Sequence, residues 1–344
     1  MCLYRTRFKG GYPSKAKTII LRHMKNKVRH SIPIYLYIAL FVIIAVFLVV
    51  GSLKDVDVSH KLFNPENKFG KIFETFGLFF GHGLVVIGGV AVFSGTFFRK
   101  HILFKIIGIA ILVVAFGVAT YLFADAIGTF GKDPKFYGYR FDKSWMALLV
   151  SAALMALVAL LGFFIIDMKK QDEALRVGII ILAAAIIQVL IINLLKGMGG
   201  RPRYRFLLDT EWNDGTHYGV VYEFKNWYQF AFWKNPSNDF FKSWPSGHSG
   251  FAASFLAIAY LPNMMRRRFK FDNYVFFGIG LLYLVLMMIA RIIIGAHFLS
   301  DVSMGALIGT FAAFISSFVV EKIQVFPWEK KKEEAPAEIP ETNE

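Results

Sequence analysis

Long apolar blocks divide the chain and constrain its fold more than any other feature of the sequence. A transmembrane helix needs about 20 mostly apolar residues, with about 17 as a lower limit. The block at 249–264 is slightly short, but a basic cluster ends it and the next block requires a reversal. We therefore predict an all-α polytopic membrane helix bundle with about eight transmembrane helices, at 33–53, 75–97, 106–124, 146–167, 177–195, 249–264, 273–294 and 302–320.

Composition and charge support the membrane class and exclude others. The chain is 56% hydrophobic, above the roughly 45–50% of a soluble domain. Its net charge of +15 would suggest nucleic acid in a soluble protein. Here Lys and Arg lie mainly in the termini and between apolar blocks, so we expect a lipid bilayer and no nucleic acid as partner. Cys2 is the only cysteine, which excludes an intrachain disulfide and a thiolate metal site.

The basic residues between the blocks predict the orientation. With the N-terminus in the cytoplasm, the short connections 98–105, 168–176 and 263–272 are cytoplasmic and denser in Lys and Arg than the opposite loops, 54–74 and 125–145. This bias follows the positive-inside rule. We therefore predict a multi-pass cell-membrane protein with both termini cytoplasmic and the segment 196–248 on the extracytoplasmic side.

The two ends of the chain have distinct compositions. Residues 1–32 hold nine Lys or Arg and are interpreted as a basic cytoplasmic arm. Residues 321–344 combine three consecutive lysines with a run of Glu, Pro and Ala. Such a polar, charged composition is typical of disorder, so we predict a disordered cytoplasmic tail.

Three polar clusters lie at the ends of apolar blocks, and the first is a basic one. Lys196, Arg201, Arg203 and Arg205 fall within ten residues, together with glycines that allow close backbone approach. Cations that flank a membrane helix usually lie on the cytoplasmic side, whereas this cluster is predicted outside. Guanidinium groups bind phosphate oxygens in pairs and a lysine adds a point charge, so the cluster is a candidate phosphate site.

The second cluster is Trp-Pro-Ser-Gly-His at 244–248, directly before an apolar block. Ser246 suits a helix N-cap, and the free N–H groups of the first turn attract an anion. His248 would then lie beside the anion with a proton to donate. A capped helix with an incidental histidine is the alternative interpretation.

The third cluster places Arg291, His297 and Asp301 in an otherwise apolar stretch. Ionisable residues at membrane depth are costly and are candidate functional residues. If the segment is helical, the four-residue spacing puts His297 and Asp301 on one face. A carboxylate would orient the imidazole, so we interpret His297 as the nucleophile and His248 as the acid. A structural His–Asp pair is the alternative.

In order and spacing, the three clusters resemble the signature of the type-2 phosphatidic acid phosphatase superfamily. That signature is Lys, six residues, Arg-Pro; then Pro-Ser-Gly-His; then Ser-Arg, five residues, His, three residues, Asp. Lys196 and Arg203 have the required separation, and the other two clusters match in spacing. Two positions depart from it, because Tyr204 follows Arg203 where the family has proline and Ala290 precedes Arg291 where it has serine.

The resemblance implies a domain organisation. The family core has six helices with three before the first motif, whereas this chain has about five. We therefore expect residues 33–124 to contain added N-terminal transmembrane helices, and residues 146–320 to form the six-helix phosphatase core.

The resemblance also implies a mechanism and a set of site residues. His297, oriented by Asp301, attacks phosphorus to give a phosphohistidine, and His248 protonates the leaving group. Neither a metal nor another cofactor is expected. The residues expected to bind phosphate are Lys196, Arg203, Ser246, Gly247 and Arg291, with Arg201 as a second contact.

The implied function is metal-independent hydrolysis of a lipid phosphate or diphosphate at the extracytoplasmic face. Candidate substrates are phosphatidic acid, phosphatidylglycerophosphate, a polyprenyl diphosphate and a phosphoglycolipid. A phosphotransferase that moves phosphate between lipids is an alternative, and an anion transporter is the non-enzyme alternative. The segment 196–248 is rich in Tyr, Trp and Phe, which we interpret as an interfacial belt or as rings that guide a lipid tail.

Overall fold

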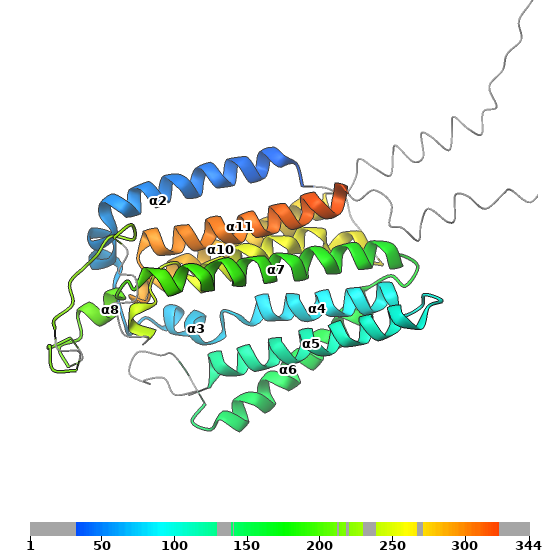
Figure 1. Ribbon diagram of the computed structural model, residues 1–344, viewed down its shortest axis with the longest axis horizontal. Helices are drawn as coiled ribbons and strands as arrows, with labels where there is room; N and C mark the ends of the chain where they lie inside the picture. The colour runs from blue at the N-terminus through cyan, green and yellow to red at the C-terminus, as the bar shows by residue number, and fades with distance from the viewer. Residues whose placement is uncertain are drawn as a thin grey trace, which may run out of the picture.

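The protein is a bundle of long helices that lie side by side (Figure 1). The computed structural model describes residues 32–128, 139, 141–211, 213–217, 220–229, 239–266 and 271–322. Almost all of the basic arm and of the predicted tail lies outside these residues. The elements in chain order are α2 (Ile34–Leu62), α3 (Lys68–Phe76), α4 (Phe79–Thr96), α5 (Ile102–Ile127), α6 (Ser144–Ile165), α7 (Gln171–Gly199), α8 (Tyr204–Leu207), η2 (Asp239–Phe241), α9 (Gly247–Ser254), η3 (Phe255–Met264), α10 (Asp272–Ile293) and α11 (Leu299–Lys322).

The predicted all-α membrane class is confirmed. Seven helical stretches of the described residues are long and apolar enough to cross a membrane. α2, α5 and α6 expose most of their apolar side chains, as suits contact with lipid, whereas α4 and α11 are largely buried in the bundle. α4 packs against α5, α6 and α7, and α11 packs against α2, α7 and α9.

The eighth predicted span, 249–264, is a composite of α9 and η3. A 3₁₀-helix rises about 2.0 Å per residue and an α-helix about 1.5 Å, so the 8 residues of α9 and the 10 of η3 reach about 32 Å. This length matches a hydrocarbon core of about 30 Å. Met265, just beyond η3, accepts a hydrogen bond from the Lys170 ammonium at 2.7 Å. The composite therefore ends beside the start of α7.

An eighth crossing also fits the positions of the first and last described helices. α2 begins and α11 ends at the same end of the bundle, and α8 lies at the other (Figure 1). An even number of crossings is needed to return the chain to the end at which it started. We call the end with α8 the site end, because the three polar clusters meet there.

The prediction that 54–74 is a loop is wrong. α2 continues to Leu62, and the chain forms a further short helix, α3, before α4. The Asn67 side chain accepts a hydrogen bond from Gly70 N at 2.9 Å and caps α3, which is the usual role of asparagine at a helix start. α3 packs against α5 and α10. Its residues are therefore part of the bundle at the site end.

Glycines at the crossing of α9 and α11 bring the second and third clusters together. A Cβ at Gly305 of α11 would overlap the Ser246 carbonyl oxygen, and one at Gly309 would overlap the Gly250 carbonyl oxygen. Only a residue without a side chain allows such close backbone approach, which is typical of helix contacts in membranes. The packing of these two helices thus fixes the histidine-bearing segments against each other.

Part of the aromatic segment 196–248 packs inside the protein at the site end. Phe206, Phe240 and Phe241 are buried and pack with Tyr222 into one cluster. The Trp227 and Trp244 rings stack 5.6 Å apart. These ring contacts stabilise the packing of the segment between α8 and α9 at the site end. Trp212, Tyr218, Phe230, Phe232 and Trp233 lie outside the described residues.

Candidate active site

The three polar clusters converge on one cavity of about 340 Å³ at the site end. Backbone hydrogen bonds join the segments: Arg205 N donates to Gly295 O at 2.9 Å, and Ser246 N donates to Asp301 O at 3.0 Å. Gly295 has a left-handed φ of 64° and turns the chain from α10 toward His297. Six of the nine predicted site residues line the cavity, namely Lys196, Arg203, Gly247, His248, Arg291 and His297.

His297 is buried and its ring is fixed by a main-chain group. Its Nδ1 lies 2.6 Å from the carbonyl oxygen of Ser243. A carbonyl oxygen can only accept, so Nδ1 carries the proton and Nε2 carries the lone pair of the neutral ring. The hydrogen bond therefore selects the tautomer in which Nε2 is the basic, nucleophilic nitrogen.

The predicted direct pairing of Asp301 with His297 is corrected by the structure. The nearest carboxylate oxygen lies 4.0 Å from His297 Nδ1, beyond hydrogen-bond distance. The prediction assumed a helix through both residues, but α11 begins at Leu299, after His297. Asp301 instead accepts from Ser243 Oγ at 2.6 Å and from Phe298 N at 2.8 Å. It supports the residue that holds His297.

Ser246 also differs from its predicted role. It is the N-cap of α9, as expected, and its hydroxyl oxygen accepts from Ser249 N at 3.4 Å and from Ser249 Oγ at 3.2 Å. The side chain is fully buried and does not line the cavity, whereas Gly247 and His248 do. The helix start thus presents its first-turn backbone, and not the serine hydroxyl, to a bound anion.

The first cluster contributes two cations to the cavity. Lys196 lies in the last turn of α7, and a Cβ at Gly247 would be 3.5 Å from its ammonium nitrogen. Arg203 forms an ion pair with Asp239 at 3.0 Å, and its backbone N–H donates to Phe240 O at 2.9 Å. Lys196 therefore lies beside the start of α9, and Arg203 lines the same cavity.

Arg291 is held by a carboxylate that the sequence did not single out. Glu74 of α3 lies 3.3 Å from the Arg291 guanidinium and 2.9 Å from that of Arg205, and all three side chains are buried. One carboxylate between two guanidinium groups leaves a net positive charge beside the cavity. A bound phosphate would complete the neutralisation.

Arg201 does not reach the cavity, contrary to its prediction as a second phosphate contact. Its guanidinium is buried between Asp55 of α2, at 2.8 Å, and Asp301, at 2.5 Å. The ring of Phe298 covers it at 4.2 Å. With two carboxylates as partners, this guanidinium is engaged inside the protein. Its two ion pairs connect α2 to the start of α11. Because Arg203 lines the cavity and Arg201 does not, Arg203 is the arginine that occupies the motif position.

The surroundings of His297 favour its neutral form. Burial lowers the pKa of His297 well below its usual value of 6.5, and the positive charges of Arg291, Arg203, Lys196 and a protonated His248 lower it further. An unprotonated imidazole is the nucleophilic form. These positive charges thus also favour an unprotonated His297 at neutral pH.

Further lining residues were not predicted as site residues. His82 of α4 and Gln188 of α7 are buried at the cavity wall, and His82 packs against the Phe251 ring at 4.8 Å. Their helices were predicted, but their convergence depends on tertiary packing that local patterns do not reveal. Among the described residues, no group of three or more His, Cys, Asp or Glu side chains is arranged to hold a metal ion.

The comparison with protein families agrees with this geometry. The model of the PAP2 superfamily matches residues 175–324. This part of the chain belongs to the PAP2 superfamily. Its members are generally phosphatases, and seven helical stretches of the described residues are long and apolar enough to cross a membrane. Comparisons with curated proteins and with solved structures gave no match.

The PAP2 match spans α7 after its first turn, α9, η3, α10 and α11, and hence all three clusters. Both departures from the family signature have local explanations. Tyr204 packs against Phe63 and Phe298 at 5.3 and 5.8 Å between ring centres, and so connects α8 to the end of α2. Ala290 is buried, and its carbonyl would lie 3.5 Å from a Cβ at Gly70 of α3. Residues outside the PAP2 match occupy the space around both positions.

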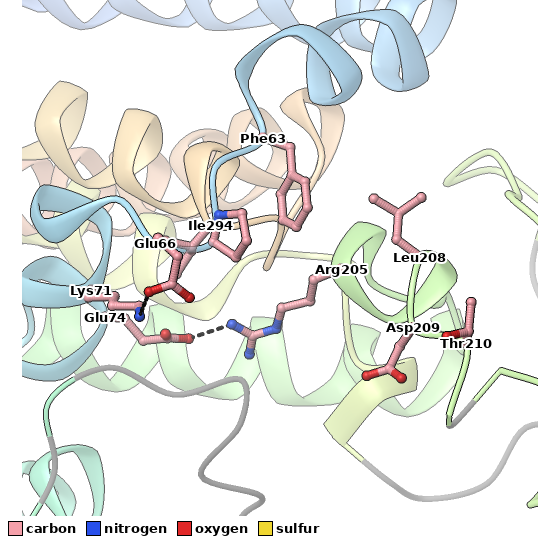
Figure 2. Close-up of a pocket in the computed structure, with 10 residues that line it drawn as sticks. Phe63, Glu66, Lys71, Glu74, Arg205, Leu208, Asp209, Thr210 and Ile294 are labelled. Atoms are coloured by element: carbon pink, nitrogen blue, oxygen red, sulfur yellow. Dashed lines mark hydrogen bonds and ion pairs between the residues drawn. The ribbon is translucent and has the colours of Figure 1, made fainter.

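A second cavity of about 340 Å³ has Glu74 and Arg205 in its wall (Figure 2). Glu74 lines both cavities, and Arg205 lines the second. At its rim Lys71 and Glu66 form an exposed ion pair at 2.7 Å. The Glu74–Arg205 ion pair therefore forms part of the wall beside the first cavity.

Proposed function

We propose that this protein is an integral-membrane phosphatase that hydrolyses a lipid phosphate or diphosphate through a phosphohistidine, without a metal ion. The observation that carries the proposal is the hydrogen bond from His297 Nδ1 to Ser243 O, 2.6 Å long. It leaves the Nε2 lone pair available in a cavity lined by Lys196, Arg203 and Arg291. A nucleophile next to convergent cations suits attack on a phosphoryl group.

In the first step Nε2 of His297 attacks phosphorus and the bond from phosphorus to the leaving oxygen breaks. His248 gives its proton to that oxygen, which leaves as an alcohol or as a phosphate. The phosphorylated imidazole keeps its Nδ1 proton, held by the Ser243 carbonyl. The cations neutralise the charge on the equatorial oxygens of the transition state, as metal ions and arginines do in other phosphoryl transfers.

In the second step His248 removes a proton from water, and the resulting hydroxide attacks phosphorus. The bond between phosphorus and Nε2 breaks, inorganic phosphate leaves, and His297 returns to its neutral form. His248 is left protonated for the next cycle. One histidine therefore serves as acid and then as base, which general acid–base catalysis requires of a two-step transfer.

The topology supports a location for this chemistry. If the ends of α2 and α11 away from the site are cytoplasmic, as the basic connections suggest, the cavity lies on the extracytoplasmic side. Within this proposal residues 33–124 are an addition to a core at 146–320. Asp55 and Glu74 belong to the added part and pair with Arg201 and Arg291, so the addition would support the site and not merely anchor the chain.

The experiment that tests the function is phosphate release from a panel of lipid phosphates by the purified protein in detergent with EDTA. The panel contains phosphatidic acid, phosphatidylglycerophosphate, a polyprenyl diphosphate and a phosphoglycolipid. We expect release from at least one lipid, and near-complete loss with His297→Ala and with His248→Ala. Release that persists in His297→Ala, or that disappears with EDTA alone, would contradict the mechanism.

Two further measurements separate the alternatives. Denaturation in alkali, in which phosphohistidine survives, should retain phosphate on His297 in the His248→Ala variant. Addition of an alcohol or a second lipid as acceptor shows whether water or that acceptor takes the phosphate, and transfer would favour a phosphotransferase. An anion transporter predicts flux into vesicles that survives His297→Ala.

A further inference from the structure

An apolar groove lies along α4, α5 and α7, three helices that also line the catalytic cavity. Its volume is about 730 Å³, and α4, α5 and α7 line it almost entirely with aliphatic side chains. We call it the α4–α5–α7 groove. Thr96, at its far end, is the only hydroxyl-bearing residue among the described residues that line it.

The groove and the catalytic cavity follow the same faces of the same three helices. Residues three or four apart in a helix lie on one face, one above the other. On each helix one residue of the cavity is followed at this spacing by the nearest residue of the groove. The pairs are His82 and Val85 on α4, Leu122 and Val118 on α5, and Val189 and Ile186 on α7.

The packing of the three helices leaves the groove accessible from the lipid side. α4 packs closely against both α5 and α7, whereas α5 and α7 make at most marginal contact with each other. α4 is therefore the floor and the other two helices are the walls. Wall residues such as Val114, Val118 and Ile186 are exposed. A molecule could thus enter sideways from the bilayer.

Two buried polar groups mark the boundary between the cavity and the groove. His82 Nε2 and Gln188 Oε1 have no hydrogen-bond partner in the part of the chain that the structure describes. The two residues are only 5% and 2% exposed. Buried polar atoms are usually hydrogen-bonded, so these two atoms point to a ligand with a polar group at this level. We call this pair the neck.

We propose that the α4–α5–α7 groove holds the hydrocarbon chain of the phosphorylated lipid substrate. The phosphate occupies the catalytic cavity, and the oxygen-bearing group between phosphate and chain lies at the neck. The groove runs along α7 from Ile186 to Leu175, which corresponds to about 17 Å at 1.5 Å per residue. That is more than half of a hydrocarbon core of about 30 Å, so the groove suits a long chain. This inference rests on the proposed function.

The first test narrows the groove. Ala183→Phe adds a ring inside the groove, and Ala156→Phe adds the same ring on the exposed face of α6, outside both cavities. The measured quantity is the ratio of kcat/KM for a long-chain lipid phosphate to that for a short water-soluble phosphate ester. We expect Ala183→Phe to lower this ratio about 10-fold or more, the scale on which apolar pockets discriminate. Ala156→Phe should leave it unchanged.

The second test does not depend on turnover. A long-chain alkyl phosphate with a photoreactive group in its tail is bound to the His297→Ala variant in vesicles, and labelled residues are located by mass spectrometry. We expect labels on groove residues of α5 and α7 that excess unlabelled alkyl phosphate removes. Labels spread over the outer faces of α5, α6 and α7 and resistant to competition would mean that bulk lipid fills the groove. That result would overturn the inference.

The two proposals fail in distinguishable ways. Absence of phosphate release from every substrate by the unaltered protein, with specific labelling of the groove, would overturn only the proposed function. Normal phosphate release with an unchanged substrate ratio in Ala183→Phe would overturn only the groove.

Discussion

His297 Nδ1 donates a 2.6 Å hydrogen bond to the backbone carbonyl of Ser243. That carbonyl is fixed from two sides, because Ser243 N donates to Arg201 O at 3.1 Å and Ser243 Oγ donates to Asp301 Oδ2 at 2.6 Å. Asp301 therefore acts on His297 through Ser243. The carboxylate holds the main chain that holds the imidazole.

This relationship predicts that Ser243→Ala slows turnover. The variant keeps the carbonyl but loses the hydroxyl that anchors it, and leaves Asp301 with one fewer donor. Loss of one hydrogen bond of this kind is worth about 1 kcal/mol, so we expect kcat to fall about 5-fold with little change in KM. Ser303→Ala is the matched control, because Ser303 is an equally buried serine whose hydroxyl bonds to Leu299 O within α11. An equal loss in both variants would argue against a positioning role for Ser243.

The pH dependence of kcat/KM should reflect the lowered pKa of His297. The nucleophile must be unprotonated, and burial together with nearby cations keeps it so below its usual pKa of 6.5. The acid limb assigned to His297 should therefore lie below pH 6.5. In kcat/KM, the position of this limb reports the pKa of His297 in the free enzyme.

Arg203→Gln tests the cause of that shift. Removal of a positive neighbour raises the pKa of His297, because Arg203 is among the groups that lower it. The acid limb should then move to higher pH, toward the usual value for histidine. Arg176→Gln, at the opposite end of α7, serves as the control and should leave the limb in place. A limb that does not move in Arg203→Gln would contradict the electrostatic explanation.

Arg201 and Arg203 of the first cluster should differ in what their loss affects. Arg201 is buried between two carboxylates, so Arg201→Met leaves Asp55 and Asp301 charged and unneutralised. Breaking a buried ion pair in this way costs about 3–5 kcal/mol. We expect a large drop in the thermal unfolding midpoint in detergent.

Arg203→Met is the comparison for that drop. Arg203 faces the cavity and pairs with the partly exposed Asp239. Its loss should reduce kcat/KM strongly and change the unfolding midpoint little. If instead Arg201→Met retained its stability and lost only activity, Arg201 would be a phosphate contact, as the sequence predicted.

The sequence predicted the spans from local patterns, and it predicted a common site from the order of the three clusters and the side of the membrane on which they fall. Runs of apolar residues predict membrane helices, and the spacing of Lys196, His248 and His297 at helix ends predicts a common site. The Asp301 prediction failed on one local detail, the start of α11 at Leu299. Helix boundaries follow from capping and packing and are uncertain by one or two residues in a pattern.

Asp55 and Glu74 could not be predicted as partners of the site. Their partners lie 146 and 131 residues away in the chain, namely Arg201 and Arg205. Both acids fall in 54–74, which was predicted as an extramembrane loop, so neither counted as an ionisable residue at membrane depth. Had the helices been extended through this segment, the cost of a buried carboxylate would have marked both as candidates.

Glu74 provides the last prediction, because it lines both cavities and pairs with Arg205 (Figure 2) and with Arg291. Glu74→Gln leaves two buried guanidinium groups facing each other without a carboxylate. We expect a loss of about 3 kcal/mol or more in the free energy of unfolding, the usual scale for breaking a buried ion pair. Arg291 would also lose its orientation toward the cavity, so kcat should fall as well.

Inorganic phosphate should partly restore the stability of Glu74→Gln, since an anion in the cavity can neutralise Arg291 in place of the carboxylate. The matched control is Glu66→Gln at the rim of the second cavity, where the side chain is 82% exposed and pairs with Lys71. Exposed pairs contribute at most about 1 kcal/mol, so this variant should unfold at nearly the native temperature. Thermal unfolding of both variants with and without phosphate makes the comparison. Equal midpoints for Glu74→Gln and Glu66→Gln would show that Arg291 does not depend on Glu74.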